Sequence, residues 1–178
     1  SDKNDFSKYV PCDVYELFKS AKTANAKELY PALAYILRTK TARELAEINE
    51  VTEGLENRLK ASVYECTGFS EIAEFVKSKR YTQSKINRIL FSILLNIDKA
   101  MPRTMPEYIR VLGMNKKGMS LLSDIKRNTS LPIITKTADY KGLCNSFETD
   151  ILASDLYTVC QSRPCFGHDY ITSPIIMR

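Results

Sequence analysis

The chain has 178 residues, of which 44% are hydrophobic and 26% are charged. This length and composition are typical of one globular domain with at most a small appendage, and they exclude a disordered or fibrous chain. The formal net charge of +5 suits an anionic partner, but many ordinary proteins are as basic, so charge alone selects no function.

Five cysteines are scattered without a CxxC pair, and the sequence has one histidine, His168. This pattern disfavours a disulfide framework or a zinc site, and it indicates reduced thiols in a cytoplasmic protein. No apolar run reaches the roughly 20 residues that a membrane span needs, and no signal-peptide core follows the polar start. Because the sequence does not begin with Met, we expect a piece of a longer protein.

Apolar residues at helical spacing predict a series of helices in the first eighty residues. The expected helices are a short one within residues 9–22 with Tyr15 and Phe18 inward, one from Leu29 to about Lys40, one opened by the capping box Thr41–Glu44, one from Thr52, and one over Glu71–Lys79 capped by Ser70.

The most apolar run of the sequence predicts a core helix that begins after the N-cap residue Thr82 and continues to Ile97. The residues of its inward face are Ile86, Ile89, Leu90, Ile93, Leu94 and Ile97. Five cations, with no acidic residue among them, precede and open the helix: Lys77, Lys79, Arg80, Lys85 and Arg88. We interpret residues 77–97 as a core helix with a cationic entrance.

After a proline-containing linker over 101–106, the pattern changes to strand, helix and strand. The expected elements are a strand over Tyr108–Leu112, a helix from the cap Asn115 to about Arg127, and a strand over Leu131–Thr135. Such a βαβ unit, over about residues 107–136, pairs its strands in parallel. A helix around Phe147–Cys160 and an irregular tail over 163–178 complete the prediction.

No catalytic motif stands out. The sequence lacks GxGxxG and GKS/GKT phosphate loops, HEXXH and GxSxG, and it has only six glycines. His168 lies in the predicted tail, where a surface histidine is far more common than a general base. We therefore predict no catalytic residue and no metal ligand in this chain, which would not catalyse by itself.

Two interpretations of the basic cluster remain open. Cations around Tyr81, a potential stacking group, suit phosphate contact with base stacking, whereas a solvated charged face is more common in an arbitrary protein. Other cations follow or precede the cluster at Arg58, Lys60, Arg103, Arg110, Lys116 and Lys117. The candidate RNA-binding residues of the cluster itself are Lys77, Lys79, Arg80, Lys85 and Arg88, and Arg58 joins them only through the resemblance described next.

Four blocks then give the sequence a family resemblance: Val51–Leu59, Lys77–Thr82 with Asn87–Leu90, Tyr108–Gly113, and Leu131–Lys136. Over about residues 28–160 the chain resembles the C-terminal half of the bacterial tRNA(Met) cytidine acetate ligase family. Members of that family carry an N-terminal Rossmann-like nucleotidyltransferase domain with an HIGH-type ATP motif. They form acetyl-adenylate from ATP and acetate and then acetylate the wobble cytidine of elongator tRNA(Met).

The resemblance implies that this chain holds the tRNA while a missing domain performs the chemistry. ATP and acetate, with magnesium, would belong to the full-length enzyme. The implied partners are tRNA and the protein's own N-terminal nucleotidyltransferase domain, with a homo-oligomer also compatible. The residues that match the family's basic blocks are Arg58, Lys77, Lys79, Arg80 and Arg88, whereas Lys85 is included on charge alone.

The expected fold is mainly α, a bundle-like helical domain over residues 28–162 with a small two-stranded βαβ appendage. Residues 1–27 would link to the missing nucleotidyltransferase domain, and residues 163–178 would form the tail. Two alternatives remain. The segment Lys79–Lys85 could reach back to the nucleotide site, since it resembles the signature loop of class I synthetases. The whole domain could instead be a scaffold that docks the missing domain or a second copy without binding RNA.

Overall fold

The computed structural model describes residues 7–21, 24–52, 54–101, 105–140, 142–161 and 164–177. Its helices are η1 (Ser7–Tyr9), α1 (Cys12–Ser20), η2 (Ala26–Leu29), α2 (Tyr30–Thr39), α3 (Ala42–Ala46), α4 (Leu55–Glu65), α5 (Phe69–Val76), α6 (Gln83–Leu94), α7 (Lys116–Asn128), η3 (Thr137–Tyr140), α8 (Asn145–Val159) and α9 (His168–Ile171). Its strands are β1 (Ile109–Arg110), β2 (Gly113–Asn115), β3 (Ile133–Ile134) and β4 (Ile175–Met177). The predicted mainly α class is confirmed.

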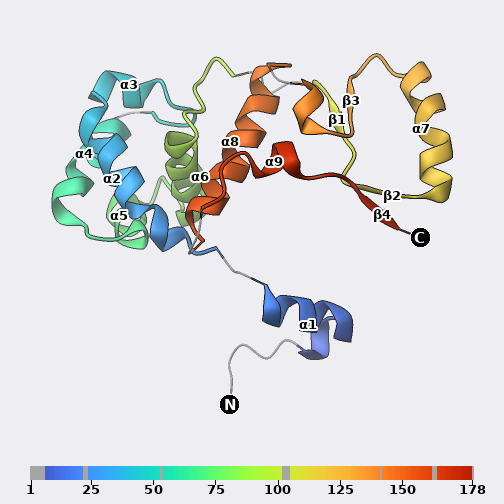
Figure 1. Cartoon of the computed structure of the whole chain (residues 1–178). Helices are drawn as coiled ribbons and strands as arrows, with labels where there is room; N and C mark the ends of the chain where they lie inside the picture. The colour runs from blue at the N-terminus through green and yellow to red at the C-terminus, as the bar shows by residue number, and fades with distance from the viewer. Residues whose placement is uncertain are drawn as a thin grey trace.

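The helices α2 to α6 gather at one end of the molecule around a common core (Figure 1). As the periodicity predicts, α6 buries Ile86, Ile89, Leu90 and Ile93, each with at most 1% of its surface exposed. These side chains meet apolar residues of α2, α4 and α5 in one hydrophobic cluster. Burial of each such side chain contributes about 1.5–3 kcal/mol, so α6 is a central element of this core.

Three local predictions differ from the structure. The helix that Ser70 was expected to cap begins earlier, at Phe69, because the Glu71 carboxylate accepts a hydrogen bond from the backbone N–H of Thr67 at 2.7 Å. The α6 helix ends at Leu94 rather than near Ile97, since Asn96 adopts a positive φ of 51°. In α1, which has no buried residue, the predicted inward Phe18 is 51% exposed.

The predicted βαβ unit is present. Strands β1 and β3 pair in parallel with α7 between them in sequence, and Ile109 is in register with Ile133. Ile134 of β3 packs with Phe147 and Ile151 of α8 in a second hydrophobic cluster. Figure 1 shows α8 between the helical end of the molecule and this βαβ unit.

The tail is more regular than predicted. It contains α9 and strand β4, which pairs in parallel with β2 in a second two-stranded sheet. Gly113 opens β2, and a Cβ atom there would lie only 3.2 Å from the carbonyl oxygen of Ile175. The expectation of an irregular tail was wrong because a three-residue strand has no recognisable periodicity of its own.

None of the helices in the described ranges is both long and apolar enough to cross a bilayer.

Candidate nucleic-acid interface

The predicted cations lie around a tight turn that joins α5 to α6. Ser78 and Tyr81 close this turn by exchanging backbone hydrogen bonds of 3.2 and 3.1 Å. Thr82 then caps α6, as predicted, by accepting a hydrogen bond from the backbone N–H of Lys85. The turn therefore leaves Lys79 and Arg80 on an exposed corner between the two helices.

Tyr81 anchors this turn and is not available as a stacking platform. Its side chain is only 7% exposed, and its hydroxyl lies 3.0 Å from both the backbone carbonyl oxygen and the hydroxyl of Thr52. The Lys85 ammonium lies 4.9 Å from the centre of the Tyr81 ring, a cation–π contact. Of the two roles considered for Tyr81 from sequence, the structure shows packing.

Arg58 reaches the same region from α4. Its guanidinium donates hydrogen bonds to the backbone carbonyl oxygens of Phe75, at 2.6 Å, and Lys77, at 3.4 Å. These carbonyls belong to the C-terminal turn of α5, where helices lack internal donors and favour a positive charge. Arg58 thus holds two helices together at the edge of the cationic surface.

Arg88 faces an acidic neighbour. Its guanidinium lies 3.3 Å from the Glu50 carboxylate, and the Arg88 side chain is 64% exposed while that of Glu50 is 23% exposed. An exposed pair of this kind contributes at most about 1 kcal/mol. The pair offsets the positive charge of Arg88 but leaves its guanidinium accessible.

The remaining cations of the cluster are Lys77, Lys79 and Arg80, and all three are exposed. Within the described part of the chain, neither the Lys77 nor the Lys79 ammonium contacts another residue through a hydrogen bond or an ion pair. The fold therefore brings the six candidates to one edge formed by α4, α5 and α6, and an RNA contact by any of them stays a prediction.

Other cations named from the sequence have structural contacts or lie elsewhere. The Lys60 ammonium lies 3.2 Å from the carbonyl oxygen of Arg38 at the end of α2. Arg110 is in the βαβ unit, Lys116 and Lys117 open α7, and Arg103 lies outside the described residues.

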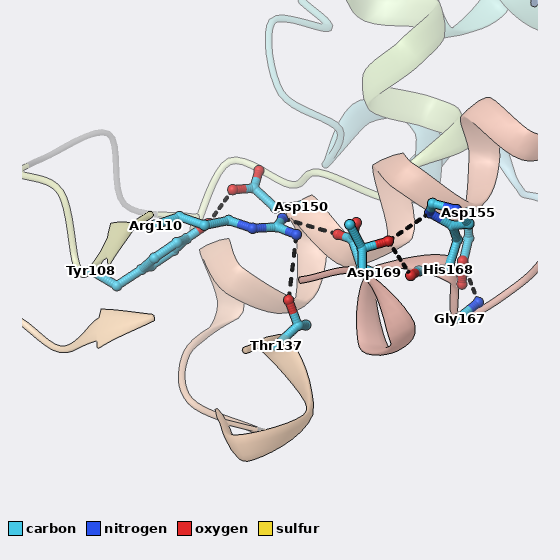
Figure 2. A network of polar contacts seen from close by, with 9 residues as sticks. Tyr108, Arg110, Thr137, Asp150, Asp155, Gly167, His168 and Asp169 are labelled. Atoms are coloured by element: carbon cyan, nitrogen blue, oxygen red, sulfur yellow. Dashed lines mark hydrogen bonds and ion pairs between the residues drawn. The ribbon is translucent and has the colours of Figure 1, made fainter. Parts of the chain in front are cut away.

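A second polar cluster ties the tail to the βαβ unit (Figure 2). Arg110 of β1 forms an ion pair of 2.9 Å with the buried Asp169 of α9, and it also lies within 3.4 Å of the Thr137 hydroxyl. The hydrogen bond to Asp169 raises the pKa of Arg110 above its ordinary value. Beside it, Tyr108 donates to Asp150, and burial together with this bond raises the pKa of Tyr108. These contacts satisfy one another, as expected of a structural cluster rather than a catalytic one.

This cluster could not be predicted from the sequence, because its members are distant in the chain and each by itself resembles an ordinary surface residue. Among the described residues, no group of three or more His, Cys, Asp or Glu side chains is placed to hold a metal ion. The single histidine also means that a motif containing two histidines does not occur in these 178 residues.

Comparisons with known proteins give this geometry a context. Residues 1–169 match the family model described as HIGH Nucleotidyl Transferase. A relative from Thermoanaerobacter sp. (strain X514), named tRNA(Met) cytidine acetate ligase, is 40% identical over 175 residues, which cover 92% of this chain and 43% of the relative. The protein of that name from Acetivibrio thermocellus is 33% identical over 178 residues, covering 92% and 43%. The chain thus spans less than half the length of these relatives.

The fold is also found in a solved structure. The crystal structure of apo Thermotoga maritima TmcAL superposes with a TM-score of 0.81 over 95% of this chain and 46% of that one, at 23% identity. A second structure of that protein, bound with alpha-thio ATP, gives a TM-score of 0.80 over 93% of this chain and 45% of that one, also at 23% identity. These similarities establish the fold.

The family match corrects one expectation. We expected this chain to be the C-terminal half of such proteins, with a separate N-terminal nucleotidyltransferase domain as its partner. The nucleotidyltransferase family model instead matches residues 1–169 of this chain, so the comparisons do not support that division. The assignment of residues 1–27 as a linker stays a prediction.

A match over nearly the whole sequence, a mainly α fold shared at a TM-score of 0.81, and relatives of one name together establish the assignment: the chain belongs to the HIGH nucleotidyltransferase family.

Proposed function

We propose that this chain is the tRNA-binding part of a tRNA(Met) cytidine acetate ligase, and that its cationic edge contacts tRNA phosphates. The relatives' shared name supports tRNA as the substrate. The observation that carries the proposal is the turn between α5 and α6, which presents Lys77, Lys79 and Arg80 on an exposed corner. Phosphate contacts from such cations supply most of the sequence-independent affinity for nucleic acid.

The rigidity of the turn supports a binding role. The paired backbone hydrogen bonds of Ser78 and Tyr81, together with the Tyr81–Thr52 contact, fix the backbone between the two helices. A turn that is already ordered loses less conformational entropy on binding than a flexible loop. Residues 77–88 contain no acidic residue, which leaves this stretch of the chain uniformly cationic.

Adenylation is proposed to depend on residues outside these 178. The sequence contains neither a glycine-rich phosphate loop nor a pair of histidines, and the named relatives are more than twice as long as the matched region. ATP, acetate and magnesium would then be used by the longer protein, and this chain alone would bind tRNA in the cytoplasm without acetylating the wobble cytidine of elongator tRNA(Met). These 178 residues contain a single histidine, so a motif with two histidines does not occur in them.

A binding experiment with fluorescent tRNA(Met) tests the proposal. At about 50 mM salt the chain should bind, and if about four phosphates are neutralised, log affinity should fall with log salt at a slope near −3, from about 0.7–0.9 per phosphate. The double variant Lys79→Glu, Arg80→Glu should lose at least about tenfold in affinity and reduce the magnitude of the slope by about 1.5.

The charge-matched control is Lys126→Glu, Lys136→Glu, which makes the same change in net charge on α7 and shortly after β3, two elements at the other end of the molecule (Figure 1). It should retain at least half of the wild-type affinity. Equal losses in the two double variants would show that only overall charge matters, and no binding by the wild type at low salt would refute a tRNA-binding role for this chain.

A further inference from the structure

The βαβ end of the molecule exposes an apolar surface that the described chain leaves uncovered. We call it the α7–β4 surface, and it consists of Met119, Leu121, Ile125, Ile175, Ile176 and Met177. Between 46% and 71% of each of these residues is exposed. In Figure 1 this end projects away from the helices α2 to α6, with β2 connecting α7 to β4.

An amphipathic helix and a parallel sheet, the two elements of this surface, normally pack against other parts of a protein. An amphipathic helix buries its apolar stripe, yet α7 has no buried residue along its thirteen positions. Parallel sheets are normally covered on both faces, yet every residue of β4 is exposed. Exposed apolar side chains gathered on neighbouring elements are typical of an interaction site.

Cations surround the apolar residues. Lys116, Lys117, Lys126 and Arg127 are exposed on α7, and Asp124 offsets only Arg127, at 3.4 Å. In a symmetric dimer through this surface, the cationic margin of one copy would lie near the cationic margin of the other, which is unfavourable. The surface therefore fits a partner with an apolar centre and an acidic margin.

The family comparison supplies such a partner. The chain covers only 43% of the Thermoanaerobacter relative and 46% of the Thermotoga maritima protein, so more than half of each lies outside the matched region. We infer that the α7–β4 surface is an interface for that remaining portion of the longer family members, which would present an apolar patch with acidic residues at its margin. This inference rests on family membership and is independent of tRNA binding.

Hydrogen–deuterium exchange on two existing proteins tests it: this chain and the full-length Thermoanaerobacter relative. The segments of the relative that align with α7 and β4 should exchange at least about tenfold more slowly than α7 and β4 of this chain. The segment aligned with α6 is the internal control and should exchange alike in both. Equal exchange of the α7 and β4 segments in the two proteins would refute the interface.

Side-chain variants provide a second test of the interface. Leu121→Glu with Ile125→Glu should leave the melting temperature of this chain unchanged within about 1 °C, because neither residue is buried here. Substitution by Glu at the two aligned positions of the full-length relative should abolish the slow exchange of its α7 segment. The exchange of its α6 segment should stay unchanged. Unfolding of this chain by the double substitution would overturn the inference. Slow hydrogen exchange of α7 that appears only at high concentration of this chain, or only with added tRNA, would overturn it as well.

Discussion

The guanidinium of Arg58 lies 2.6 Å from the backbone carbonyl oxygen of Phe75, and this hydrogen bond joins α4 to the end of α5. The family resemblance made Arg58 one of the six RNA-binding candidates. The structure distinguishes it, because its charged group already has backbone partners at the C-terminal end of a helix.

Replacement of Arg58 should therefore affect stability. We expect Arg58→Ala to lower the free energy of unfolding by about 1–2 kcal/mol, since a hydrogen bond to a charged group and a helix-end interaction are both lost. Lys77→Ala, at an exposed position whose side chain makes no hydrogen bond or ion pair among the described residues, should change it by less than about 0.5 kcal/mol. Urea unfolding measures both, and equal effects would contradict the assigned role of Arg58.

Removal of the acidic neighbour should strengthen RNA binding at Arg88. Glu50→Gln takes away the carboxylate that lies 3.3 Å from the guanidinium. If Arg88 contacts a phosphate, tRNA affinity should rise about two- to threefold and the salt dependence should steepen by up to about 0.9 in slope. Glu74→Gln, which removes the same charge from an exposed position on α5, is the control, and identical gains in both variants would assign the effect to net charge.

The ion pair between Arg110 and Asp169 should stabilise the tail. Asp169→Asn leaves the partly buried guanidinium without its carboxylate, and we expect a loss of about 2 kcal/mol in the free energy of unfolding. The double variant Arg110→Met, Asp169→Leu should lose less than Asp169→Asn, because it removes both charges together. Chemical unfolding checks this order, and a double variant less stable than Asp169→Asn would contradict it.

Glu71 should make stability depend on pH in the acidic range. Hydrogen bonds from the backbone N–H and the hydroxyl of Thr67 lower the pKa of Glu71 below its ordinary value of 4.5. A group whose pKa is lowered by folding contributes stability above its unfolded pKa, and this contribution is lost as pH falls through the folded value. Glu71→Gln should thus be less stable than the wild type above about pH 4.5, and the gap should close at lower pH.

Thermal melts between pH 2 and pH 7 measure that gap. Glu74→Gln, on the same helix, should follow the wild-type curve throughout. A Glu71→Gln deficit that persists unchanged at pH 2 would show that the side chain stabilises the helix by packing and not by its charge.

Much of the helical core could be predicted from local pattern. The spacing of Ile86, Ile89, Leu90 and Ile93 identified the buried face of α6, and Thr41 with Glu44 forms the predicted capping box. The change to strand, helix and strand likewise identified β1, α7 and β3. These features depend on residues within a few positions of one another, and such short-range periodicity is visible in a single sequence.

Long-range contacts decided the rest. The sequence by itself determined which α-helices form up to residue 160 and where the cations cluster, because helix periodicity and charge order are local properties. Only the tertiary structure showed that Tyr81 is buried against Thr52, that Arg58 and Arg88 already have partners, and that Ile175–Met177 pair with β2. These contacts join residues that are 17 to more than 60 positions apart, and their formation depends on how the elements pack, a property that no window of the sequence contains.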